Sequence, residues 1–264
     1  GSGPARARGA PRRALALRTA AVLGGALAVA AALWGTVRLG GLLVRVPARE
    51  WGLLALALGA TALRAAGALA VATAVMVPLG VLLGRSREWS RRLQPVVQIV
   101  ASFPAPMLYP LVTAGLLALR VPFAVVAAVL MGLGAQWYVL FNVLAGASSI
   151  PGDLEEASAV YGVSGLRRFA TLDLPSVFPF LVTGLVTAAG GAWNASIVAE
   201  TLAFRGTELS TFGLGSLITR ATHDGNFPLL AAGVLTMSLA LVLLNRTVWR
   251  RLYGVAATRY ALNR

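Results

Sequence analysis

The stretch LPSVFPFLVTGLVTAAGGAWNASIVA, residues 174–199, contains no Asp, Glu, Lys or Arg. A helix of this length rises about 39 Å, which exceeds the roughly 30 Å hydrocarbon core of a bilayer. Further uncharged runs lie at residues 19–37, 65–84, 93–119, 121–152 and 225–245. Such runs leave no polar faces to cover a soluble core. The sequence therefore predicts an all-α polytopic membrane protein with about six transmembrane helices.

Charge supports this interpretation and predicts an orientation. The chain is 58% hydrophobic and carries a net charge of +14. Its arginines gather between the apolar runs, at 6–18, 85–92, 167–168 and 246–264, instead of on one soluble face as in a nucleic-acid-binding protein. By the positive-inside rule both termini lie in the cytoplasm. Residues 39–63 are then expected to form an external loop and an interfacial helix.

These boundaries divide the chain into four expected parts. A basic cytoplasmic segment covers residues 1–18, and the first span with its external loop covers 19–49. The main transmembrane domain is expected at 50–253 and a cytoplasmic tail at 254–264. The first residue is not Met, which permits either a chain of its own or one half of a longer, duplicated polypeptide.

The placement of ionisable residues argues against several classes of function. All nine acidic residues fall in sequence at span boundaries or in loops, whereas gradient-driven transporters keep working charges inside their spans. His223 is the only His, there is no Cys, and His223 with Asp224 is expected to be an external loop pair. This set offers no catalytic, metal or cofactor site. Without Lys there is also no phosphate-binding loop, so ATP chemistry would have to come from another subunit.

The segment 151–175, PGDLEEASAVYGVSGLRRFATLDLP, is the longest polar interruption between spans. Asp153 is predicted to cap a short helix with Glu156 as its third residue, and Gly162 to end that helix. Ser164 is predicted to cap a second helix that ends before Pro175. Taken alone, this cytoplasmic pair of helices is either a plain connector or a docking element.

The residues of this loop resemble the EAA loop of bacterial ABC importer permeases. The match consists of Glu156, Ala157, Ser158, Gly162, Leu172, Leu174 and Pro175. Ser158 stands where the family usually has Ala, and Leu172 where it often has Ile. The resemblance, which covers residues 54–253, implies coupling helices that insert into a cytoplasmic ATPase subunit. It also implies a second permease half (a homodimer or a fused repeat), an external solute-binding protein and a bacterial inner-membrane location.

A second segment of the chain resembles one particular branch of this family. The segment GGAWNASIVAE at 190–200, followed by Gly213-Leu214-Gly215, is similar to the nitrate, sulfonate, taurine and bicarbonate permeases, and especially to the second half of fused permeases. It implies a small anion as solute. The alternatives are a gradient-driven secondary transporter, which lacks the intramembrane charge, and a non-transporting scaffold, which leaves the loop unexplained.

Two segments are candidates for the solute path. Pro104, Pro106 and Pro110 should break the run at 93–119, either beside a water-lined path or for packing alone. Small residues at 184–192 are predicted to be packing contacts. Three neighbouring residues that could face a pore are Trp193, Asn194 and Ser196, although Trp193 and Glu200 are alternatively interface anchors.

Overall fold

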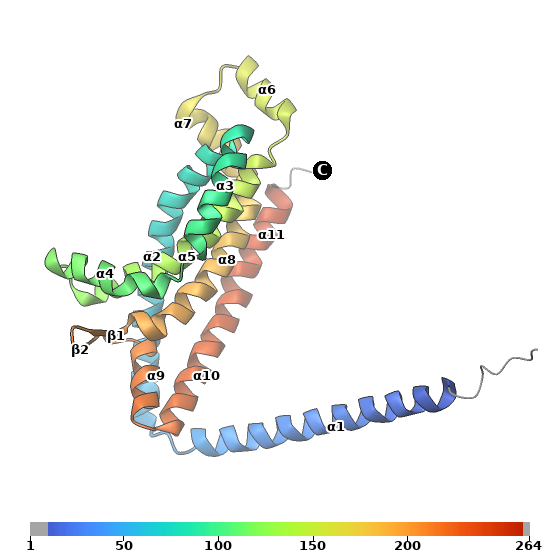
Figure 1. The fold of residues 1–264 in the computed structure, drawn as a ribbon, viewed down its shortest axis with the longest axis vertical. Coiled ribbons are helices and arrows are strands. Elements are labelled where there is room, and N and C mark those ends of the chain that lie inside the picture. The colour runs from blue at the N-terminus through green and yellow to red at the C-terminus, as the bar shows by residue number, and fades with distance from the viewer. Residues whose placement is uncertain (1–9, 261–264) are drawn as a thin grey trace, which may run out of the picture.

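The computed structural model describes residues 10–260, which form a long helical bundle with one small hairpin (Figure 1). The N-terminal elements are α1 (Ala10–Leu43), α2 (Ala48–Gly84), α3 (Arg87–Ser102), α4 (Ala105–Ala118) and α5 (Phe123–Ser148). The central elements are α6 (Gly152–Val160), α7 (Gly165–Arg168), the π-helical turn η1 (Phe169–Asp173) and α8 (Leu174–Ala199). The C-terminal elements are β1 (Thr201–Phe204), β2 (Thr207–Ser210), α9 (Leu214–His223), α10 (Phe227–Leu244), the π-helical turn η2 (Asn245–Trp249) and α11 (Arg250–Arg259).

The core lies between α2, α5 and α8, where small residues allow close packing. The tightest positions include Gly80 of α2, Gly146 of α5 and Gly184 of α8. A Cβ atom added at Gly184 would lie 2.9 Å from the Tyr138 carbonyl oxygen of α5. The residues predicted as packing contacts at 184–192 include Ala188, which is fully buried. Lipid gives no hydrophobic drive for helix association, so close contact of this kind holds the bundle together.

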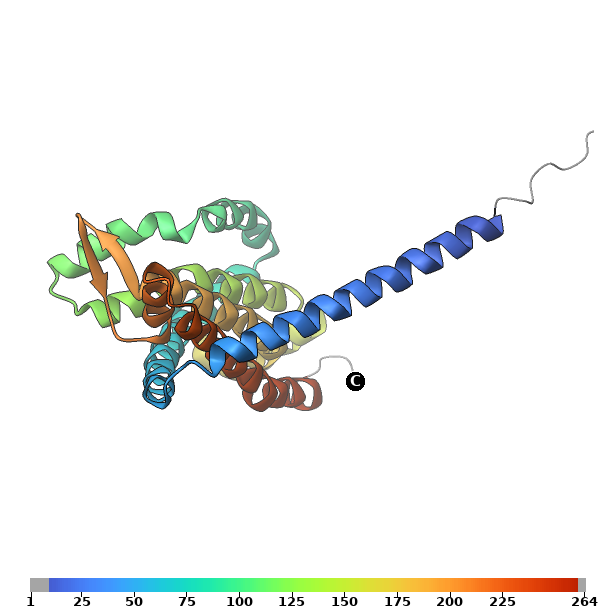
Figure 2. The same ribbon diagram turned by 90° about the horizontal axis from the view of Figure 1, so that it is seen from below.

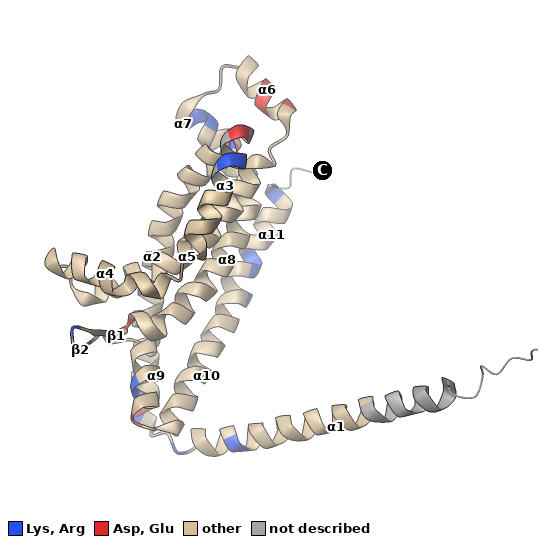
Figure 3. Ribbon diagram, viewed as in Figure 1, with Lys and Arg blue, Asp and Glu red and all other residues tan. Residues whose placement is uncertain are grey.

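The predicted class, an all-α membrane protein, is confirmed. Among residues 10–260, five helices are long and apolar enough to cross a membrane, or six if the bent pair α3–α4 counts as one span. Charged residues lie mostly toward the ends of the bundle and on α11, while α5 is uncharged along its length (Figure 3). The first helix, α1, leads away from the bundle (Figure 2).

The prediction for residues 39–63 is wrong. Residues 48–63 are the first half of α2, which continues without a break to Gly84. Buried Leu54, Ala57 and Thr61 recur at helical spacing and face the core, and no Gly-Pro or polar cluster interrupts the helix. Arg64 marked the apparent boundary in the sequence, but an ion pair within the bundle neutralises it.

The proline-rich run does break, as predicted. Helices α3 and α4 meet at an angle of 80° between Ser102 and Ala105. Pro104 precedes α4 in an extended conformation, with ψ at 112°, and Pro106 lies in the first turn of α4, where a missing N–H is tolerated. In both views α4 extends from the same side of the bundle as the hairpin of β1 and β2 (Figures 1 and 2).

Two features between α7 and α9 differ from expectation. The second loop helix does not end before Pro175, because α7, η1 and α8 form one continuous helical run. The π-turn accommodates the proline by shifting a bond, so that the Leu174 N–H donates to the Phe169 carbonyl. The hairpin was not predicted. It turns at Arg205 and Gly206, with φ values of 51° and 79°, the positive pair that tight hairpins need.

We predict that Gly184→Leu disrupts the packing of α8 on α5. Overpacking of a close contact costs about 1–3 kcal/mol, so the thermal unfolding midpoint in detergent should fall. Gly59→Leu is a matched control, because a side chain at Gly59 meets nothing within 4 Å. Equal midpoints for the two variants would contradict the close α5–α8 contact.

Candidate functional site

The loop between α5 and α8 stands at one end of the bundle and contains two short helices, as predicted (Figure 1). Gly162 ends α6 with a φ of +64°, a conformation that L side chains rarely adopt. The Val163 N–H donates to the Ser158 carbonyl at 2.9 Å, and the Gly162 N–H donates to the Ala159 carbonyl at 3.1 Å. This pattern closes the helix end in a Schellman motif.

Ser158, the departure from the usual motif, has a structural role in this turn. Its side chain is 8% exposed, and its hydroxyl donates to the Val163 carbonyl at 3.0 Å. Ser158 and Val163 are thus joined by two hydrogen bonds in opposite senses. The neighbouring motif residues Glu156 and Ala157 are exposed, whereas Leu172, Leu174 and Pro175 are half-buried at the base of the loop.

The predicted helix caps need correction. Helix α6 starts at Gly152 after Pro151, whose extended backbone (ψ 140°) begins the helix, and the Asp153 carboxylate accepts only from the adjacent Leu154 N–H. Glu156 therefore lies in the second turn and forms no capping box. Ser164 does precede α7, but its side chain makes no capping hydrogen bond. The helix therefore starts two residues earlier than the Asp-x-x-Glu pattern suggested, with Pro151 instead of Asp153 at the position before it.

An ionic cluster at the base attaches the loop to α2. Asp173 is fully buried, and its two oxygens lie 3.4 Å from Arg168 Nε and 3.8 Å from Arg85 Nη2. Arg168 also reaches Glu155 of α6 at 3.1 Å. The cluster of Arg85, Glu155, Arg168 and Asp173, hereafter the base cluster, thus connects α2, α6, α7 and η1. Sequence analysis did not predict this cluster, because Arg85 lies far along the chain from the other three residues and no α-helical spacing pairs Arg168 with Glu155 or Asp173.

Beyond the base cluster the loop exposes large apolar side chains. Val160 is 83% exposed, Tyr161 81% and Leu166 86%. The loop that carries these residues projects beyond the end of α2 (Figure 1). Grouped apolar side chains on a polar surface mark interaction sites.

The candidate pathway residues differ in how exposed they are in the structure. Trp193 is 5% exposed and Ser196 is fully buried, so both lie inside the bundle of this chain, whereas Asn194 is exposed. Pro104 and Pro106 are exposed at the α3–α4 break. Which of these contact a solute stays a prediction.

Asn194 belongs to a polar strip along the bundle. Thr183, Thr187 and Asn194 recur at helical spacing on the exposed face of α8. Tyr138 and Asn142 of α5 border this face, since the Tyr138 ring lies 3.2 Å from an added Cβ at Gly191 and Asn142 Cβ lies 3.0 Å from one at Gly184. The polar strip, made of Tyr138, Asn142, Thr183, Thr187 and Asn194, contains no charged residue.

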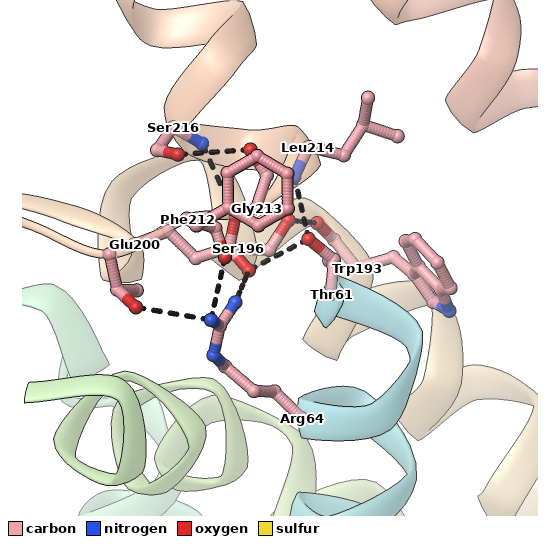
Figure 4. A network of polar contacts seen from close by, with 10 residues as sticks. Thr61, Arg64, Trp193, Ser196, Glu200, Phe212, Gly213, Leu214 and Ser216 are labelled. Atoms are coloured by element: carbon pink, nitrogen blue, oxygen red, sulfur yellow. Dashed lines mark hydrogen bonds and ion pairs between the residues drawn. The ribbon is translucent and has the colours of Figure 1, made fainter. Parts of the chain in front are cut away.

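A second polar network lies where α8 ends (Figure 4). Glu200 is fully buried, and its Oε1 accepts from Arg64 Nη1 at 2.6 Å and from Thr61 Oγ1 at 2.8 Å. Its Oε2 accepts from the Ser216 N–H at 3.3 Å. Glu200 follows a span in sequence, but in space it lies against the middle of α2. Glu200 directly follows α8, at a span boundary as expected, and its full burial inside the bundle argues against the alternative of an interface anchor.

The segment Gly213-Leu214-Gly215, noted in the sequence, packs against this network. An added Cβ at Gly213 would overlap the Glu200 carboxylate, and one at Gly215 would overlap the Ser196 carbonyl. Glycine is thus required at both positions, because other atoms come too close to the backbone for a side chain to fit. Within residues 10–260, no three His, Cys, Asp or Glu side chains gather as metal ligands.

We predict that Asp173→Asn loosens the loop. The change leaves Arg85 and Arg168 without their shared buried carboxylate, and breaking a buried ion pair costs roughly 3–5 kcal/mol. Limited proteolysis should therefore cut within 152–168 faster than in the parent protein. Glu88→Gln is the control, because Glu88 and its partners Arg91 and Arg92 are exposed and such pairs contribute little. Identical cleavage rates for Asp173→Asn and the parent would contradict the role of the base cluster.

Comparison with known proteins agrees with this architecture. Residues 76–253 match the family described as binding-protein-dependent transport system inner membrane component. In the solved MetNI methionine ABC transporter, in an inward-facing conformation, one chain superposes with a TM-score of 0.65 at 20% sequence identity, covering 80% of this chain and 99% of that one. This likeness concerns the fold.

Relatives in sequence include several permeases. A putative ABC transporter permease protein of Methanocaldococcus jannaschii is 28% identical over 193 residues, covering 69% of this chain and 68% of the relative. The nitrate import permease protein NrtB of a Synechocystis species is 25% identical over 185 residues (70% and 64%). The bicarbonate transport system permease protein CmpB of Synechococcus elongatus is 27% identical over 137 residues (52% and 48%). The matches thus span about half to two thirds of these relatives. Since the family match covers most of the chain, this protein belongs to the binding-protein-dependent transport system inner membrane components, the permease subunits of ABC importers.

Proposed function

We propose that this chain forms one half of the solute path of an ATP-driven importer and receives motion from a separate ATPase through the α6–α7 loop. The observation that carries the proposal is the exposed apolar group Val160, Tyr161 and Leu166 on a loop anchored by the base cluster. In this proposal the loop end faces the cytoplasm, as the arginine distribution predicts.

The loop has the properties of a docking element. Its apolar side chains would be buried by a partner, and aromatic residues such as Tyr161 often anchor interfaces. The base cluster beneath holds α6 and α7 to the ends of α2 and α8, so a displacement of the loop moves both helices. A plain connector would not need a buried carboxylate at its base, because burying a charge is costly unless it is paired.

The polar strip supports the proposal of a solute path. Thr, Asn and Tyr side chains on an exposed face of a membrane helix would meet lipid unless a path or a partner covers them. A second permease half, either another copy or a fused repeat, would place two strips opposite each other. Uncharged hydrogen-bonding groups would let a small polar solute pass without being trapped.

The solute class rests on the relatives. Two of them are named for nitrate and for bicarbonate, both small anions, and we propose a solute of this kind, with sulfonates and taurine as further candidates. The family description names a binding protein, so an external solute-binding protein is the expected donor. Specificity would then rest mainly on that protein.

We predict that Gly162→Val uncouples the importer. A β-branched residue at φ +64° distorts the turn, at a cost of at least about 1–2 kcal/mol. Because the turn lies outside the bundle, the variant should insert normally while solute-stimulated ATPase activity and uptake both fall in the reconstituted complex. The control is Gly152→Val in the same loop, where no positive φ occurs and a Cβ meets nothing within 4 Å. Normal coupling in Gly162→Val would reduce the loop to a connector.

We predict that Asn194→Leu slows transport with little effect on folding. The residue is exposed, so the change removes a polar contact of the path, worth about 1 kcal/mol or more, and uptake should fall severalfold at unchanged protein level. Val198→Leu, one turn along the same face, keeps an apolar residue and serves as control. If the two variants transport equally, Asn194 faces lipid or a packing partner instead.

A further inference from the structure

We propose that Glu200, together with Arg64 and Thr61, is a positioning site that fixes the start of α9 against α2 and so connects the far end of the bundle to the coupling loop. The inference rests on the proposed function above. Helix α9 lies away from the loop, beyond the end of α8 (Figure 1). The site joins groups of α2 to groups of the end of α8 and the start of α9, more than 130 residues further along the chain (Figure 4).

The hydrogen bonding of the site determines where α9 begins. The first N–H groups of a helix have no partner within the helix, and a residue just before it usually supplies one. Here that residue is Gly213, which has no side chain. Instead the Leu214 N–H donates to Thr61 Oγ1 at 2.8 Å and the Ser216 N–H donates to Glu200 Oε2. The start of α9 is thus capped by α2 and by the end of α8.

Thr61 is the central link. Its hydroxyl donates to Glu200 Oε1 at 2.8 Å and accepts from Leu214, so both of its functions are used. Thr61 is fully buried. A residue of the same shape without a hydroxyl would therefore interrupt the chain of bonds between Glu200 and α9 while preserving the packing.

Arg64 holds the segment before α9. Its Nη2 donates to the Phe212 carbonyl at 2.6 Å and to Thr211 Oγ1 at 3.1 Å. The Thr211 N–H in turn donates to the Glu200 backbone carbonyl at 2.9 Å. One guanidinium group therefore joins α2 to the end of α8 and to the segment between β2 and α9.

A role in stability alone does not explain such a site. An ionisable residue inside a membrane span is costly, and a buried ion pair can often be replaced by apolar residues without loss of stability. An ion pair whose hydrogen-bonding groups are all satisfied instead holds the surrounding segments in one geometry. The overlap of a Gly213 Cβ with the carboxylate shows how closely the surroundings fit this geometry.

The same two helices are joined by one ion pair toward each end. Helix α2 carries Arg64 and, some 31 Å further along at 1.5 Å per residue, the adjoining Arg85. Asp173, the last residue of η1, directly precedes α8, and Glu200 directly follows α8. With both pairs formed, α2 and α8 cannot slide past each other, so a displacement at the loop reaches α9 and the hairpin.

Four variants test the site. Thr61→Val removes the hydroxyl at nearly constant shape, and Thr61→Ser restores it. Gly213→Ala displaces the carboxylate without removing any polar group, and Glu200→Gln keeps the shape but not the charge. Matched controls are Glu208→Gln on the hairpin and Arg220→Gln on α9, both exposed side chains of the same region.

The first measurement is hydrogen–deuterium exchange of the purified permease over residues 211–217, which requires no transport. We expect about tenfold faster exchange in Thr61→Val, Gly213→Ala and Glu200→Gln, and parental exchange in Thr61→Ser and both controls. The second is solute imported per ATP hydrolysed in the reconstituted complex, which should fall severalfold in the same three variants and recover in Thr61→Ser.

Each outcome decides one point. Unchanged exchange in the three variants would overturn the capping of α9 by this site. Faster exchange with an unchanged transport ratio would make the site purely structural and overturn its role in coupling. If the parent complex itself shows no ATP-driven uptake, the proposed function fails, while the exchange result still tests the positioning of α9.

Discussion

The close approach of α2 and α8 to α5 is the constraint on which the rest of the structure depends. In a bilayer the apolar faces of helices gain little from leaving lipid, so helices associate where small residues allow dense contact. Gly80 on α2 and Gly184 on α8 provide such contact with α5, together with Gly146 on α5 itself. This packing fixes the lateral positions of the three helices and leaves the polar strip on one outer face.

Apolar contacts between helices are non-directional, so polar contacts add a further constraint on how far one helix slides along another. Arg64 with Glu200 and Arg85 with Asp173 set the relative height of α2 and α8, one pair toward each end. The carboxylates are buried in both cases, so neither pair can exchange its partner for water. Glycine contacts thus set the positions of the helices across the bundle, and the ion pairs set their positions along the helix axes.

Much of the fold follows from local sequence. The apolar runs located the spans, the prolines located the break between α3 and α4, and Gly162 located the end of α6, because each effect depends on a few neighbouring residues. The mistaken boundary at Arg64 has a long-range cause. Arg64 was treated as a boundary because its partner Glu200 lies 136 residues away and cannot be recognised from sequence spacing. In the base cluster only Arg85 is a distant partner, while the pairs of Arg168 with Asp173 and Glu155 follow no regular α-helical spacing. The hairpin is too short to show a strand pattern.

The two ends of the α2–α8 pair are not equally constrained. At the far end both oxygens of Glu200 accept hydrogen bonds, and the shortest is 2.6 Å. At the loop end Asp173 Oδ2 has no hydrogen bond, and Arg85 approaches it only to 3.8 Å. A buried oxygen without a hydrogen bond stores a cost that a small rearrangement can relieve. In the proposed coupling the loop end would therefore have room to change its geometry on partner binding, whereas the fully hydrogen-bonded Glu200 end would transmit the change.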